Sequence, residues 1–361
     1  MNDQVDKWKD TSLKCIAIHS EGDKATGSQL KAYDVIFTNP ENAVSPQFKQ
    51  KVKENLQGSV CVVAFDEAHC LTEWGLTSFR SEYANLTDLL AVIPEAPVLV
   101  MTGTMSPEMR TNTMNNLQIY AYKTVAISPD RPDIYIGYDT ADRNNFQWLF
   151  DDLATQGNQC DKTIIYCRTV GEVTATFGEF LDKLGPRIYC NGDKTVIENR
   201  LVDQYSSVIA ESSKRRILKL FSIPSNLRVV IATLAFGMGI DIPDIRHILI
   251  WGYPETICHY WQELGRASRD AQGGRCIFYP AFVPGTIKCS DALRTVISRI
   301  SEPNTCLRLK ILQHLWLPEM GDLPPMKDRC NGSCSKCDCA SCTCCHTCKQ
   351  ACPCTTSAAS Q

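Results

Sequence analysis

The sequence predicts an α/β protein with two parallel-sheet domains, followed by a small helical, cysteine-rich module. Short runs of apolar and β-branched residues, such as 163–167 and 229–233, have no charged interruption, which is typical of strands buried on both faces of a parallel sheet. Amphipathic stretches alternate with these runs and indicate helices packed on the sheet faces. Ten of the 20 cysteines fall within residues 330–354 and mark a separate module.

Composition limits the possible classes of protein. At 361 residues the chain is long enough for two domains and an appendage. Its hydrophobic content of 44% and charged content of 21% are those of an ordinary globular protein. The net charge of −3 excludes a basic coat over the whole surface, so any nucleic-acid groove must be local. No apolar run has the length of a membrane span, and nothing near the N-terminus resembles a signal-peptide core.

The cysteines divide into two groups. Scattered ones, such as Cys61 and Cys167, are expected to be inert core thiols. The dense group contains C-x2-C spacings on a chain without an export signal. This combination favours a metal site over disulfides.

A helix rich in arginine is predicted after Pro254. Its apolar positions follow the i, i+3, i+4, i+7 rule: Ile257, Tyr260, Trp261 and Leu264. The same spacing places Gln262, Arg266 and Arg269 on the opposite face. Two planar, permanently charged guanidiniums beside a glutamine suit a polyphosphate, although a solvated helix face would explain them too.

Two carboxylates follow the predicted buried strand 60–65, in the sequence Asp66-Glu67-Ala68-His69. Ligands of open α/β sheets gather at the carboxyl ends of the strands. Asp66 is therefore a candidate ligand for Mg²⁺, and Glu67 a candidate to polarise an attacking water. An acidic helix start would account for the same four residues.

The order of these motifs resembles that of superfamily 2 helicases. Residues 229–270 resemble motifs V and VI, with Gly239 and Asp241 in the sequence FGMGID, and QELGRASRD resembles motif VI of the RecQ family. That family more often has glycine where this chain has Ser268 and Ala271. Residues 66–69 resemble its DEAH box, and Thr102 and Thr104 its motif III. The resemblance implies two RecA-like domains, the first incomplete, that bind ATP and Mg²⁺ between them.

DNA contacts are also implied by the resemblance. Residues 70–83 resemble the aromatic-rich loop that follows the DEAH box in RecQ enzymes, with Trp74 and Phe79 offering faces for base stacking and Arg80 a charge. Core packing is the alternative for both aromatic side chains. The loop departs from the family pattern at Leu76-Thr77-Ser78. Asn39 and Pro40 resemble motif Ib, which touches the DNA backbone.

The P-loop of this family is not found in the sequence. Residues 2–8 resemble the end of motif Ia, so we expect the chain to begin after the P-loop. One near miss to G-x-x-x-x-G-K-[ST], residues 22–28, lacks the lysine that reaches the phosphates.

The cysteine module resembles the zinc-binding domain of RecQ proteins. Cys306 resembles the first zinc ligand, and the expected Zn²⁺ ligands are Cys306, Cys342, Cys345 and Cys348. Three cysteines give an alternative set: Cys330, Cys334 and Cys337.

The predicted domains are residues 1–137, 138–284 and 285–354, followed by a disordered tail at 355–361. The expected function is an ATP-dependent 3′–5′ DNA helicase of RecQ type in the nucleus, acting on single-stranded and forked duplex DNA in repair and recombination. A catalytically inactive DNA- or partner-binding remnant is the alternative, because the P-loop is missing. A DEAH-type RNA helicase is a third interpretation, disfavoured by the Trp74 loop and the cysteine module.

Overall fold

The computed structural model describes residues 5, 8–19, 27–73, 85–140, 142, 146–234, 236, 241–281, 289–299, 305–325 and 343–353. The chain divides into two compact units, Met1–Ile127 and Ser128–Gln361. The division falls earlier than the boundary expected at residues 137 and 138, because β5 (Ile134–Tyr138) pairs with β10 (Gly274–Tyr279) in the sheet of the second unit. The cysteine module belongs to this second unit as well.

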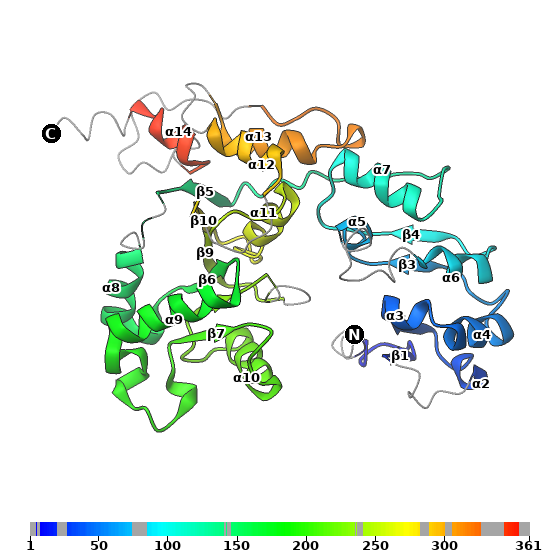
Figure 1. Ribbon diagram of the computed structural model, residues 1–361, viewed down its shortest axis with the longest axis horizontal. Helices are drawn as coiled ribbons and strands as arrows, with labels where there is room; N and C mark the ends of the chain where they lie inside the picture. The colour runs from blue at the N-terminus through cyan, green and yellow to red at the C-terminus, as the bar shows by residue number, and fades with distance from the viewer. Residues whose placement is uncertain are drawn as a thin grey trace. The chain divides into compact units, whose positions relative to one another are not determined.

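The first unit contains two short parallel strand pairs (Figure 1). β1 (Cys15–Ile18) pairs with β2 (Val35–Thr38), and β3 (Val63–Phe65) pairs with β4 (Val98–Val100). Its helices are α2 (Gly27–Leu30), α3 (Pro40–Ala43), α4 (Pro46–Asn55), α5 (Cys70–Glu73), α6 (Thr87–Val92) and α7 (Pro107–Asn116). Leu30, Phe48, Leu71 and Leu89 are among the residues that form its core.

The prediction of a buried strand over residues 60–65 is wrong in part. β3 covers only its last three residues, and Val62 is 49% exposed. On the neighbouring strand Leu99 is 47% exposed. The cause is that β3 pairs only with β4 among the described strands, so part of their surface stays uncovered. Cys61, expected in the core, is exposed as well.

The second unit is built on one parallel sheet of six strands, in the order β5-β10-β9-β6-β8-β7. The four strands not yet located are β6 (Lys162–Cys167), β7 (Val202–Tyr205), β8 (Val229–Ala232) and β9 (Ile245–Trp251). Every residue of β6 and β8 is buried, as their uninterrupted runs predict. The fold class is thereby confirmed.

Helices cover both faces of this sheet (Figure 1). α8 (Gln147–Gln156) and α9 (Val170–Leu184) pack against one face and share its core with β6, β8 and β9. α10 (Glu211–Ser222) and α11 (Ile257–Leu264) lie on the other, where Phe221 approaches Phe236 and Tyr260 approaches Phe278. α9 buries Val173, Phe177, Phe180 and Leu184, while Leu181 is 39% exposed.

The remaining elements belong to the cysteine module and to short connections. They are α12 (Asp291–Ser298), α13 (Leu307–Leu315), α14 (His346–Gln350), and the 3-10 turns Gly157–Gln159, Gly185–Ile188, Cys190–Gly192, Ile197–Asn199 and Pro318–Met320. α13 buries Leu307, Ile311, Leu312 and Leu315. No helix in the described ranges is both long and apolar enough to cross a bilayer.

Candidate functional site

The two carboxylates of the first unit lie where β3 ends. Asp66 and Glu67 follow the strand directly and are exposed, and the Asp66 carboxylate accepts the backbone N–H of Glu67 at 2.9 Å. Glu67 has a φ of 49°, in the left-handed region that residues other than glycine adopt only at a cost in energy. Two exposed carboxylates at a strand end are oxygen ligands of the kind that Mg²⁺ takes.

His69 connects these carboxylates to the end of β4. Its buried ring places Nδ1 at 3.1 Å from the Thr102 hydroxyl oxygen and 3.4 Å from a Glu67 carboxylate oxygen. The Thr102 hydroxyl donates its only hydrogen to the Thr104 carbonyl at 3.0 Å, so the His69 Nδ1–H must be the donor to Thr102. The structure thus brings together four predicted site residues: Glu67, His69, Thr102 and Thr104.

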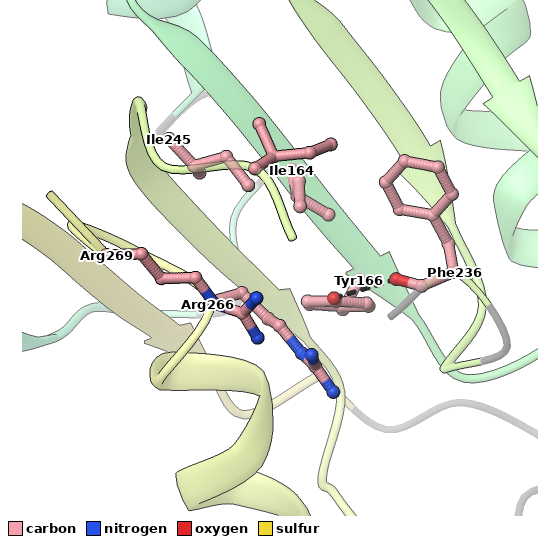
Figure 2. A pocket seen from close by; sticks show the side chains of 7 residues that line it. Ile164, Tyr166, Phe236, Ile245, Arg266 and Arg269 are labelled. Atoms are coloured by element: carbon pink, nitrogen blue, oxygen red, sulfur yellow. Dashed lines mark hydrogen bonds between the residues drawn. The ribbon is translucent and has the colours of Figure 1, made fainter. Parts of the chain in front are cut away.

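In the second unit Arg266 and Arg269 line one pocket. Its other walls are Ile164, Tyr166, Phe236, Ile242 and Ile245 (Figure 2). The Tyr166 hydroxyl donates to the Phe236 carbonyl at 2.9 Å, and burial raises the pKa of Tyr166, so it stays a neutral wall. Arg269 pairs with Asp241 at 2.7 Å, which brings two further predicted residues together.

The expected helical placement of these arginines is wrong. α11 ends at Leu264, so Arg266 and Arg269 lie in the loop that follows, while Gln262 remains on the helix and is not among the residues lining the pocket. Gly265 caps the helix, and Ser268 has a φ of 54° that no helix tolerates. The four apolar positions predicted for this helix are all buried.

Four cysteines gather in the C-terminal part of the second unit: Cys306, Cys344, Cys345 and Cys348. Their Sγ atoms all lie within 4.8 Å of one another, and that of Cys306 is 3.8 Å from those of Cys344 and Cys345. A tetrahedron of thiolates about 2.3 Å from Zn²⁺ has edges of about 3.8 Å. These residues therefore fit a closed structural zinc site.

The cysteine cluster lies against the edge strand of the sheet. The Cys344 carbonyl accepts the Ile136 N–H of β5 at 3.2 Å, and Cys345 forms a parallel bridge with Ile136. The cluster therefore continues the hydrogen bonding of the six-stranded sheet beyond β5.

Two regions of the chain match known protein families. Residues 1–112 match the family described as DEAD/DEAH box helicase, and residues 145–271 match the helicase conserved C-terminal domain. The chain belongs to the DEAD/DEAH box helicases of superfamily 2.

Curated relatives of this helicase include both DNA and RNA enzymes by name. ATP-dependent DNA helicase RecQ of Haemophilus influenzae is 28% identical over 280 residues, and RecQ of Bacillus subtilis 29% over 285. A protein of Acanthamoeba polyphaga mimivirus, provisionally named ATP-dependent RNA helicase R290, is 28% identical over 272 residues. These alignments cover 75%, 77% and 75% of this chain, in the order given, but only 41%, 44% and 45% of the relatives.

Solved helicase structures share the fold. DUF1998 helicase MrfA bound to DNA matches with a TM-score of 0.58 at 15% identity, over 82% of this chain and 40% of that one. S. cerevisiae Dbp5 bound to RNA and ADP BeF3 matches with a TM-score of 0.55 at 13% identity, over 87% and 70%. At these identities the likeness shows the fold alone.

Several predicted residues of the helicase cannot be placed. Trp74, Phe79, Arg80, Gly239 and Cys342 lie outside the described residues, as do the alternative ligands Cys330, Cys334 and Cys337. Asn39 is described: its side chain accepts the Asn42 N–H at 2.9 Å and caps α3, whose first residue is Pro40.

Sequence reasoning left out three residues that organise these sites. Cys344 was not in the expected ligand set, although the adjacent pair in CC-x2-C contained the signal. Arg131 and Arg308 were missed as well, because their partners are backbone carbonyls far away in the sequence. No local pattern marks such contacts.

Proposed function

We propose that this chain carries the helicase region of a RecQ-type ATP-dependent DNA helicase that moves 3′ to 5′ in DNA repair and recombination. The observation that supports the RecQ type most directly is the four-cysteine cluster that follows Arg266 and Arg269 in the sequence and lies on β5. RecQ relatives from two bacteria support the same assignment. The DNA substrate, the direction of movement and the nuclear placement are part of this proposal.

The residues divide the chemistry between the two units. Asp66 would hold Mg²⁺, and Glu67 would orient and polarise the attacking water. Arg266 and Arg269 would stabilise negative charge on the phosphates, because their planar guanidiniums stay charged at every physiological pH. The nucleotide would supply the phosphoanhydride bond whose hydrolysis drives movement along DNA.

The phosphates of the nucleotide have no complete cradle in these 361 residues. No G-x-x-x-x-G-K-[ST] sequence is present, so the glycine loop and its lysine are missing from the polypeptide. The carboxylates and arginines fit their roles, but this segment alone does not fit ATP. We therefore expect the 361-residue polypeptide to bind ATP weakly and to turn over little or none.

A second candidate function is a DNA- or partner-binding protein that hydrolyses nothing. The experiment compares DNA-stimulated ATP hydrolysis by this chain and by a form extended with the upstream genomic sequence. If only the extended form is active and Glu67→Gln abolishes its activity, the helicase assignment holds. Glu95→Gln, an exposed glutamate of the same unit, is the matched control and should keep full activity.

Three other outcomes would contradict parts of the proposal. Hydrolysis by the unextended chain would refute the need for a P-loop. DNA binding without hydrolysis by either form would favour the second candidate function. Stronger stimulation by RNA than by DNA, at matched length and salt, would overturn the DNA assignment.

A further inference from the structure

Arg131 contacts the backbone of the arginine loop, which we define as Gly265–Ala271. Its Nη1 donates to the Gly265 carbonyl at 3.0 Å, and its Nη2 donates to the carbonyls of Ala267 and Ser268 at 3.0 and 2.8 Å. These three carbonyls lie on either side of Arg266 and immediately before Arg269. One guanidinium therefore holds the backbone from which Arg266 and Arg269 project.

The orientation of Arg131 is itself fixed by Asp133. The carboxylate accepts from Nε at 3.2 Å and from Nη2 at 3.0 Å. Burial works to raise the pKa of Asp133, but hydrogen bonds from Arg131 and Ser268 outweigh it and hold that pKa below its ordinary value. Asp133 thus stays charged and keeps the planar guanidinium directed at the loop.

Arg308 anchors the backbone of Arg131. Its side chain is only 3% exposed, and its Nη1 donates to the Asp130 carboxylate at 2.8 Å and to the Arg131 carbonyl at 2.7 Å. Its Nη2 donates to the carbonyls of Ile134 and Cys344, the latter at 3.1 Å. The same guanidinium therefore contacts a member of the cysteine cluster and the residue that holds the arginine loop.

The arginine loop needs such support because its backbone is strained. Ser268 has a φ of 54° and Ala271 one of 58°, in the left-handed region that L-residues occupy at a cost. A bond from the Ser268 N–H to the Ile245 carbonyl at 2.8 Å holds the loop from the sheet side. The guanidinium of Arg131 holds the loop through its carbonyls. Without these N–H donors, the loop carbonyls would have to turn toward water.

We propose that Arg131 is a positioning residue for Arg266 and Arg269, and that Arg308 makes its position depend on an intact, metal-loaded cysteine cluster. The inference rests on the proposed function for the role of the two arginines. The coupling itself is physical and does not require that the chain hydrolyse ATP. Loss of the metal loosens Cys344, then Arg308 and Arg131, and then the arginine loop.

The test is hydrogen exchange of the backbone amides of Ser268, Asp270 and Ala271 in the 361-residue chain, all of which have backbone acceptors. Arg131→Gln is expected to speed their exchange by tenfold or more, while Arg131→Lys, which keeps a charged donor, should restore part of the protection. Arg200→Gln is the matched control, because Arg200 is comparably exposed and bonds to Asp203 and Tyr189 instead. It should leave exchange in the arginine loop unchanged.

Two further readouts separate positioning from general stability. The side-chain Nε resonances of Arg266 and Arg269 should shift in Arg131→Gln and not in Arg200→Gln. Amides of β6 report folding of the whole unit, and their exchange should stay the same in Arg131→Gln. If Arg131→Gln unfolds, the test rests on Arg131→Lys. Faster amide exchange in the arginine loop of that variant, with exchange in β6 unchanged, supports the proposal.

Removal of zinc by a chelator tests the dependence on the cluster. Chelation should speed exchange in the arginine loop of the wild-type chain, and should add nothing in Arg308→Gln, where the connection is already cut. Unchanged loop exchange in the Arg131 variants would overturn the positioning role. Loosening confined to residues 306–348 after chelation would overturn the coupling to the cluster.

Discussion

Replacing Glu263 with glutamine tests how far the second unit depends on one buried ion pair. Arg168 follows β6 directly, and its guanidinium meets the Glu263 carboxylate of α11 through two bonds of 2.9 Å. The Glu263 side chain is 0% exposed and that of Arg168 is 9% exposed. The Nε of Arg168 has no hydrogen-bond partner among the described residues, so Glu263 compensates most of its charge.

The expected loss follows from this burial. Removing one partner leaves a buried charge without compensation, which costs about 3–5 kcal/mol. That is roughly two to four powers of ten in the unfolding equilibrium constant. Replacing both partners, as Arg168→Met with Glu263→Leu, removes the buried charges together and should recover most of the loss.

Urea unfolding with hydrogen exchange of β6 amides measures the effect, because a chain of two units need not unfold in one step. Arg246→Met is the matched control. Arg246 makes a similar double contact with Asp270, but both side chains are partly exposed, at 21% and 26%, so the loss should be clearly smaller. Equal losses in Glu263→Gln and Arg246→Met, or a double variant as unstable as the single one, would refute the reasoning.

Three other predictions concern the metal, the strained loop and pH. A serine in place of Cys306, Cys344, Cys345 or Cys348 should cost the protein one equivalent of zinc, measured by elemental analysis, whereas Cys342→Ser should keep it. Loss of zinc from Cys342→Ser as well would show that the four-cysteine cluster is not the complete ligand set. Ala271→Gly should raise the free energy of unfolding by up to about 1 kcal/mol, because the φ of 58° costs an alanine more than a glycine; a lower thermal midpoint would contradict this. Burial first, and Arg275 second, lower the pKa of His247 below its ordinary 6.5, so the folded unit binds this proton less readily than the unfolded chain. The contribution of neutral His247 to the free energy of unfolding is therefore fully present above about pH 6.5 and is lost as the pH drops below that value. His247→Gln should weaken this pH dependence in urea titrations between about pH 7 and pH 5.

Much of the fold could be predicted from local sequence. β8 and residues 163–167 of β6 are runs of apolar and β-branched residues without a charge, and a strand buried on both faces requires that pattern wherever it lies. The family is also readable from short motifs, because the residues of the DEAH box and of QELGRASRD are contiguous in the chain. The metal-binding character of the C-terminal module could be predicted from the number and the C-x2-C spacing of its cysteines.

The tertiary structure decided what depends on distant partners. Helical spacing placed Arg266 and Arg269 on one helix face, but α11 ends at Leu264. The carbonyls that follow bond to Arg131, which lies more than a hundred positions earlier in the chain. Cys344 takes its place beside Cys306 because its backbone bonds to Ile136 of an edge strand. The sequence alone determined which residues carry the chemistry, whereas long-range hydrogen bonds to backbone carbonyls, which leave no local pattern, decided where those residues lie.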